Sequence, residues 1–192
     1  MKGGWLVGVL AVVVLGYITV NSVRTQGLDR LEPGTPLPRF AVPLAARALE
    51  GDANVSDDAC AVAGDDVLRV CDLSARGPAV LAFVVTSAGE CARQVDVLDR
   101  VAPRFPDVGF AAVAVRGDRG DLRELVRERG WTVPVGYDHD GAAAIRYGLG
   151  AVCPLITFAD RDGRVAGTAL GLLDDAALRE RVAALVAGRP LP

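Results

Sequence analysis

The 192-residue chain is long enough for one α/β domain with its own hydrophobic core, and too short for two once a targeting segment is set aside. Its formal net charge is −3 and its pI is near 5.2, with Lys and Arg scattered among Asp and Glu. Because nucleic-acid binding requires a basic surface patch, this composition excludes nucleic acid as an expected partner.

The first predicted element is an apolar stretch without charges at residues 3–20 (GGWLVGVLAVVVLGYITV). A helix that rises about 1.5 Å per residue would just span a hydrocarbon core of roughly 30 Å with this stretch. A cleavable signal peptide is the alternative, but neither a small-x-small cleavage site nor a lipid-accepting cysteine follows the apolar run. We therefore predict a transmembrane signal anchor over residues 1–23, with Lys2 on the cytoplasmic side and the rest of the chain extracytoplasmic.

Residues 24–38 are polar, contain Gly and Pro, and show no periodicity, so they are predicted to be a linker to one domain at residues 39–190. The even number of cysteines suits an oxidising compartment and agrees with export. These cysteines are Cys60, Cys71, Cys91 and Cys153.

The domain begins with short apolar runs at residues 39–73, which predict edge strands or hairpins ahead of the main sheet. Residues 78–85 (PAVLAFVV) and 108–115 (VGFAAVAV) are continuous apolar runs, which are typical of parallel strands buried on both faces. Between them we predict a helix capped by Ser87. Its buried face is expected to carry Cys91, Val95, Leu98 and Ala102.

The second half of the chain continues the alternation of strand and helix and ends with two adjacent strands and a helix. The order β-α-β-α-β-α-β-β-α predicts an α/β fold in which helices cover both faces of a mixed sheet. The elements predicted after residue 115 are a helix capped by Asp121 and Glu124 and ending at Gly130, a strand at 133–136, a helix at 141–147, strands at 155–158 and 164–169 around an Asp162-Gly163 turn, and a helix that Asp174 opens, with Leu178, Val182, Leu185 and Val186 on one face.

Residues 80–93 (VLAFVVTSAGECAR) resemble the strand-to-helix turn of membrane-anchored thiol-disulfide reductases of the TlpA type. That pattern is an apolar strand followed by F-W-A-T-W-C-x-x-C-R. Phe83 and Thr86 fall on its Phe and Thr, and Cys91 falls on its second cysteine. Ala88 falls on the first cysteine, so the position of the attacking thiol is held by alanine.

Residues 152–163 (VCPLITFADRDG) resemble a second segment of the same family, apolar-x-Pro-x-x-F-x-x-D-x-x-G. Pro154 matches the proline whose peptide bond is cis in thioredoxin folds and whose loop lies against the cysteine turn. The resemblance covers about residues 38–188. It implies a thioredoxin-like three-layer fold with a mixed central sheet, and a substrate-binding role for the loop around Pro154.

The replaced cysteine removes ordinary C-x-x-C exchange, because the first thiolate attacks the partner disulfide and the second resolves it. Cys153 offers a substitute, since it directly precedes Pro154 on the loop that faces the cysteine turn. Cys91 and Cys153 could then approach within disulfide range, roughly 4.4 to 6.8 Å between Cα atoms. A redox pair, a permanent staple and two unpaired core thiols remain open as interpretations. Cys153 is the more exposed attacker, whereas Cys91 is better placed relative to the helix dipole.

Cys60 and Cys71 lie symmetrically about Asp65 and Asp66 in the segment CAVAGDDVLRVC. A hairpin with a two-residue turn would place the two cysteines opposite each other on adjacent strands. We therefore predict a structural disulfide between them. Neither cysteine precedes a helix or has a basic neighbour that would favour a redox role.

A metal site is not expected, because His139 is the only histidine and the only methionine is the first residue. His139 stands between two aspartates in a predicted exposed turn, where a solvated side chain is the simpler interpretation. No cofactor is expected either.

The favoured function is an extracytoplasmic thiol-disulfide oxidoreductase that acts on protein thiols or disulfides, with Cys91 and Cys153 as its catalytic pair. The domain also resembles the alkyl hydroperoxide reductase and thiol-specific antioxidant group, but Ala88 stands where that group has a threonine, which disfavours a peroxidase. The alternative is a redox-inactive thioredoxin-like binding module whose cysteines are structural and whose Pro154 loop accepts an extended peptide. The sequence indicates neither the substrate nor the oligomeric state.

Overall fold

The centre of the fold is β3 (Ala79–Val84), a strand whose residues are all buried. The computed structural model describes residues 31–87 and 89–192. β3 pairs in parallel with β4 (Gly109–Val115) and antiparallel with β6 (Leu155–Ala159). The sheet is completed at its two edges, in the order β5-β4-β3-β6-β7, by β5 (Val135–Asp138) and β7 (Val165–Leu170).

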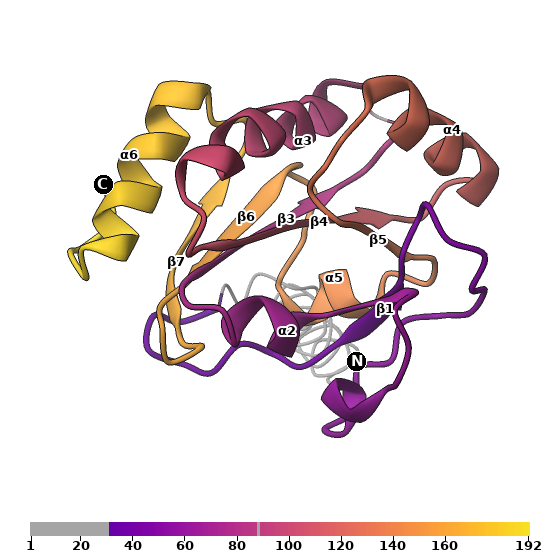
Figure 1. The fold of residues 1–192 in the computed structure, drawn as a ribbon, viewed down its shortest axis with the longest axis horizontal. Coiled ribbons are helices and arrows are strands. Elements are labelled where there is room, and N and C mark those ends of the chain that lie inside the picture. Colours follow the sequence, from indigo (N-terminus) through magenta and orange to yellow (C-terminus); the bar gives the residue numbers. More distant parts are fainter. Residues whose placement is uncertain (1–30, 88) are drawn as a thin grey trace, which may run out of the picture.

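Helices cover both faces of this mixed sheet (Figure 1). Side chains of β3 alternate between two hydrophobic clusters, as the two-residue period of a strand requires: Val80, Ala82 and Val84 enter one, and Ala79, Leu81 and Phe83 the other. The first cluster is covered by α3 (Gly89–Val101), α4 (Arg119–Arg129) and α6 (Asp175–Val186); the second by α2 (Val70–Ser74) and α5 (Ala142–Arg146). Single turns of 3-10 helix, η1 (Ala59–Ala61) and η2 (Ala102–Arg104), complete the list.

The predicted alternation of strands and helices after residue 77 is confirmed, and the three-layer arrangement with it. Asp174 caps α6 as expected, because its side chain accepts a hydrogen bond from the Ala177 amide at 2.8 Å. The predicted cap of α4 is wrong by three residues. Asp118 is extended and its Oδ1 accepts from the Asp121 amide at 3.0 Å, so that Asp121 lies inside the first turn.

The hairpin predicted around Asp65 and Asp66 is absent. β2 (Val67–Arg69) pairs instead with β1 (Ala41–Pro43), and the two form a separate antiparallel sheet. The Arg69 guanidinium donates to the carbonyls of Val62 and Gly64, which folds the preceding loop over the strand. The backbone upstream of β2 is therefore held by a side chain and cannot form a second strand beside it.

Residues 34–37, within the segment predicted as a linker, run beside the start of β7. The Gly34 amide donates to Val165 O at 2.7 Å, and the Val165 amide donates to Thr35 O at 2.8 Å. The anchor predicted for residues 1–23 and the first part of the linker lie outside the described residues. In the part of the chain that the structure describes, no helix is long and apolar enough to cross a membrane.

A buried carboxylate stands between the sheet and α5. Asp138 ends β5, is 0% exposed, and accepts hydrogen bonds from the amides of Ala143 and Ala144 at 3.4 and 2.8 Å. Burial raises the pKa of Asp138 against the opposing effect of these amides, and the nearby Asp140 raises it further. Asp138 is thus a candidate for pH-dependent stability.

We expect the protein to lose stability as the pH rises from about 4 through the raised pKa of Asp138, since the folded state binds its proton more tightly than the unfolded state does. In Asp138→Asn this loss should disappear, because the amide oxygen still accepts from Ala144 and does not ionise. Urea unfolding across a pH series measures the difference, with the exposed Asp107→Asn as control. Parallel pH profiles for the protein and Asp138→Asn would contradict the expectation.

Candidate active site

Cys91 and Cys153 meet at the carboxyl end of β3. Cys91 lies in the first turn of α3 and is 3% exposed, whereas Cys153 lies in the loop before β6 and is half-buried. Their Cα atoms are 5.7 Å apart and their sulfurs form a disulfide, although 62 residues separate them in sequence. The peptide bond between Cys153 and Pro154 is cis.

The topology of the sheet explains this meeting. β3 and β6 are antiparallel neighbours with Phe83 opposite Leu155, so the residues after β3 lie beside those before β6. α3 follows β3 after a short turn, and its first turn therefore faces the loop of Cys153 and Pro154. Ala88, in that turn, lies outside the described residues.

A single backbone amide serves both sulfurs. The Val85 N–H, one residue beyond β3, points at Cys91 Sγ at 3.2 Å and at Cys153 Sγ at 3.1 Å. Such a donor stabilises a thiolate more than a disulfide, because a hydrogen bond to a charged acceptor is stronger than one to a neutral acceptor. The site therefore has a fixed group that would stabilise negative charge on either sulfur after the bond opens.

The segment after β7 closes the site from the other side. The Gly171 amide donates to Pro154 O at 2.8 Å, and the Leu173 amide donates to Gln94 Oε1 at 2.8 Å. Gln94 is fully buried one turn after Cys91, and its Nε2 has no hydrogen-bond partner among the described residues. These bonds fix the Cys153 loop and α3 relative to each other.

Exposed apolar side chains and an acidic hollow lie next in sequence to the segments that carry the two cysteines. Three exposed apolar side chains follow or flank the Cys153 loop: Val152, Leu170 and Leu172, which are 49%, 39% and 42% exposed. Thr86 and Ser87, in the turn after β3, border a hollow of about 370 Å³ whose other lining residues include Asp118, Asp121, Glu124 and Glu128.

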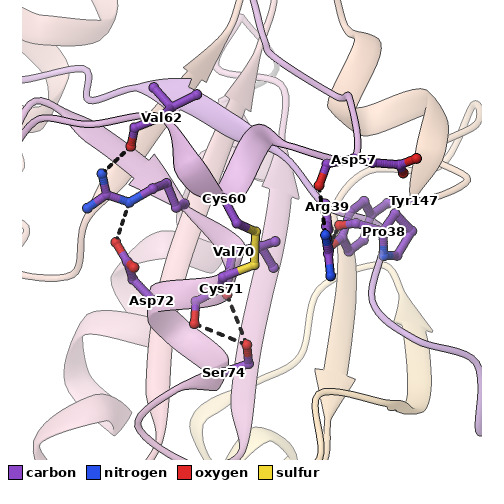
Figure 2. The surroundings of a disulfide bond; sticks show 11 residues. Pro38, Arg39, Asp57, Cys60, Val62, Val70, Cys71, Asp72, Ser74 and Tyr147 are labelled. Atoms are coloured by element: carbon purple, nitrogen blue, oxygen red, sulfur yellow. Dashed lines mark hydrogen bonds and ion pairs between the residues drawn. A yellow bond between two sulfur atoms is a disulfide. The ribbon is translucent and has the colours of Figure 1, made fainter.

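Cys60 and Cys71 form a second disulfide, in the other layer of the molecule (Figure 2). Their Cα atoms are 5.9 Å apart, and both side chains are half-buried. The bond joins η1 to the first turn of α2 rather than two strands, which corrects the predicted geometry. The Ser74 hydroxyl donates to Cys71 O at 3.2 Å. Cys71 lies in the first turn of α2, between the ion-paired Arg69 and Asp72, so the prediction that neither cysteine has a helix N-terminus or a basic neighbour is wrong for Cys71.

Sequence reasoning missed two groups of the site, Val85 and Gln94. The Val85 amide carries no sequence signal, because any residue at that position would supply it. Gln94 lies on the predicted buried face of the helix, one turn after Cys91. A polar residue on an otherwise apolar face is the sequence signal that could have identified it. His139 is exposed and its Nδ1 is 3.1 Å from Asp52 Oδ1. Among residues 31–87 and 89–192, no group of three or more His, Cys, Asp or Glu side chains could hold a metal ion.

The sheet order, the helix that follows β3 and the cis-proline loop opposite it define a thioredoxin-like fold. No protein-family model and no curated protein matches the sequence. Solved structures do match. A thiol:disulfide interchange protein of the thioredoxin family from Chlorobium tepidum is 16% identical with a TM-score of 0.61, over 81% of this chain and 97% of that one.

Two further solved structures share this fold. A secreted disulfide oxidoreductase of Mycobacterium tuberculosis, homologous to E. coli DsbE, is 27% identical with a TM-score of 0.55, over 62% of this chain and 89% of that one. A DsbF homologue from Corynebacterium diphtheriae is 19% identical with a TM-score of 0.61, over 78% and 86% of the two chains. The chain thus shares its fold with thiol-disulfide oxidoreductases.

Proposed function

We propose that this chain is an extracytoplasmic thiol-disulfide oxidoreductase whose working pair is Cys91 and Cys153. The observation that carries the proposal is that these two cysteines, distant in sequence, come together under one shared amide, that of Val85. In the reducing direction, the protein dithiol gives two electrons and two protons to a partner disulfide, which becomes two thiols while the Cys91–Cys153 bond forms. The opposite direction oxidises a partner dithiol.

Protein thiols or disulfides are the proposed substrates, and the loop of Pro154 is their proposed binding site. Pro154 is buried and its carbonyl accepts the hydrogen bond of the Gly171 amide, so a peptide would have to pair with the backbone of Cys153 instead. The exposed Val152 and Leu172 would contact the residues that flank the partner's cysteine. A substrate with apolar residues next to its cysteine fits this surface.

The membrane-anchored, extracytoplasmic location is part of the proposal, and the sequence supports it. Residues 3–20 are long and apolar enough for an anchor, and disulfides persist in oxidising compartments. Carbonate extraction of membranes should leave the full chain in the pellet, and protease added outside spheroplasts should degrade its domain. A chain that stays intact under external protease would refute this location.

Reduction of insulin by the full-length protein in detergent, with dithiothreitol as the electron source, tests the activity. We expect the protein to accelerate the reaction above dithiothreitol alone, because a paired dithiol releases the mixed disulfide intramolecularly. Oxidation of a dithiol peptide by the disulfide form tests the opposite direction. Failure in both directions would reject the oxidoreductase.

The alternative is a binding module in which both disulfides are structural. Ala88 at the family's attacking position favours it, as does the low exposure of Cys91. This alternative predicts that the Cys91–Cys153 bond survives reductants that open catalytic disulfides. It also predicts that variants without that bond still bind the partner peptide.

A further inference from the structure

We propose that a partner attacks, or is attacked by, the sulfur of Cys153, and that Cys91 serves only as the leaving group and resolving thiol. This assignment rests on the proposed function above. It moves the reacting sulfur from the helix, where the TlpA-type pattern has it, to the loop before β6. Cys91 keeps the resolving role that the same pattern gives to its position.

Access separates the two sulfurs. Cys91 is 3% exposed and belongs to the hydrophobic cluster that also contains Val95 and Leu98, so a partner sulfur cannot reach it without moving α3. Cys153 is only partly packed against that cluster and follows the exposed Val152. Thiol-disulfide exchange requires contact with the attacked sulfur, and the half-buried Cys153 is the more accessible residue of the two.

Charge stabilisation favours the same assignment. When a partner thiolate attacks Cys153, the electron pair of the broken bond moves to Cys91 Sγ. That sulfur lies in the first turn of the 13-residue α3, where the helix dipole favours negative charge. The Val85 amide is 3.2 Å from Cys91 Sγ and 3.1 Å from Cys153 Sγ, so it supports a thiolate on either sulfur and does not distinguish them. A leaving thiolate stabilised by the helix dipole departs faster.

The two exchange steps balance in atoms and electrons without another reactant. In the reducing direction, the Cys153 thiolate attacks one sulfur of the partner disulfide, forms a Cys153-partner mixed disulfide, and expels the partner's other sulfur as a thiolate. The Cys91 thiolate then attacks Cys153 Sγ, forms the Cys91–Cys153 bond, and expels the partner's first sulfur. Solvent protonates the two released thiolates. The partner gains two electrons and the protein loses two.

Single-cysteine variants of the full chain test this order, with the Cys60–Cys71 disulfide kept. Cys91→Ser leaves Cys153 free and Cys153→Ser leaves Cys91 free. With dithiobisnitrobenzoate as the disulfide probe, we expect Cys91→Ser to release thionitrobenzoate about 100-fold faster than Cys153→Ser. The thiol that remains in Cys153→Ser is the buried Cys91, which reacts only when the structure around it opens locally. In urea the two variants should react at similar rates, and Cys91→Ala and Cys153→Ala give a second pair if a serine variant does not fold.

The outcomes separate the two proposals. Faster reaction of Cys153→Ser than of Cys91→Ser, or equal rates in the folded state, would overturn the assignment of Cys153 while the oxidoreductase function stands. If neither folded variant forms a mixed disulfide although both do so in urea, the oxidoreductase function fails and the assignment fails with it. A Cys91→Ser mixed disulfide that maps to Cys153 by mass spectrometry supports the assignment.

Discussion

Replacing either Cys91 or Cys153 by serine should lower the rate of insulin reduction to that of dithiothreitol alone, because the second thiol acts intramolecularly at a high effective concentration. Without Cys153 the partner has no accessible sulfur to form a mixed disulfide with. Without Cys91 the mixed disulfide forms but is not resolved. The two variants should therefore be equally inactive in turnover, although they fail at different steps.

The matched control for these variants removes the other disulfide. Cys60→Ser combined with Cys71→Ser removes one disulfide, as each of those variants does, but in the other layer of the molecule, and should keep turnover at the same order as the unmodified protein. Far-UV circular dichroism and urea unfolding verify that all variants are folded. Turnover that survives the loss of Cys91 or Cys153 would contradict the proposed pair.

Loss of the Cys60–Cys71 disulfide should instead affect stability. The bond closes a loop with a sequence separation of 11, for which chain entropy in the unfolded state corresponds to about 3 kcal/mol. We expect Cys60→Ala with Cys71→Ala to lower the free energy of unfolding by this order, as measured in urea. The hydrogen bonds from Arg69 to Val62 and Gly64 should hold the loop partly in place in the variant.

This prediction also separates the roles of the two disulfides. A change in unfolding free energy below about 1 kcal/mol would mean that the Cys60–Cys71 bond is not a staple, because native disulfides in small domains typically contribute 2 kcal/mol or more. Loss of insulin reduction in the folded variant would mean that the bond takes part in electron transfer. Either result would contradict its assignment as structural.

Most of the central sheet could be predicted because its strands are continuous apolar runs. β3 and β4 are buried on both faces, so they differ from their flanking sequence in every residue rather than in alternate ones. The end of β5 could not be predicted, because the strand includes Asp138, whose burial depends on two amides of α5 that lie later in the chain. Local hydropathy does not contain that information.

The region before β3 could not be predicted because its contacts are not local. β1 and β2 each span three residues, too few for a periodic pattern, and they are joined by a segment that a guanidinium holds. α2 is one and a half turns long and contains the cysteine that the hairpin model placed on a strand. The hairpin interpretation paired Cys60 with Cys71 correctly, but it placed them on adjacent strands, whereas the structure places them in η1 and α2.

The candidate site could be predicted as far as its cysteines, their relative exposure and its proline. Cys91 and Cys153 lie at disulfide distance because antiparallel β3 and β6 place the end of one beside the start of the other, which the thioredoxin-like pattern implies. The Val85 amide could not be identified, because backbone donors have no residue type. The lower exposure of Cys91 than of Cys153, which distinguishes their proposed roles, is predicted by the helical face of Cys91 and is confirmed by the structure.

The reduction potential of the Cys91–Cys153 bond tests the account most directly. The full-length protein in detergent would be equilibrated with defined ratios of oxidised and reduced dithiothreitol or glutathione, and mass mapping would report which cysteines change state. We predict a midpoint for Cys91 and Cys153 between about −120 and −270 mV, and one below about −300 mV for Cys60 and Cys71. A Cys91–Cys153 bond that also resists reduction below about −300 mV, or that does not form, would contradict the oxidoreductase and leave the binding module as the better account.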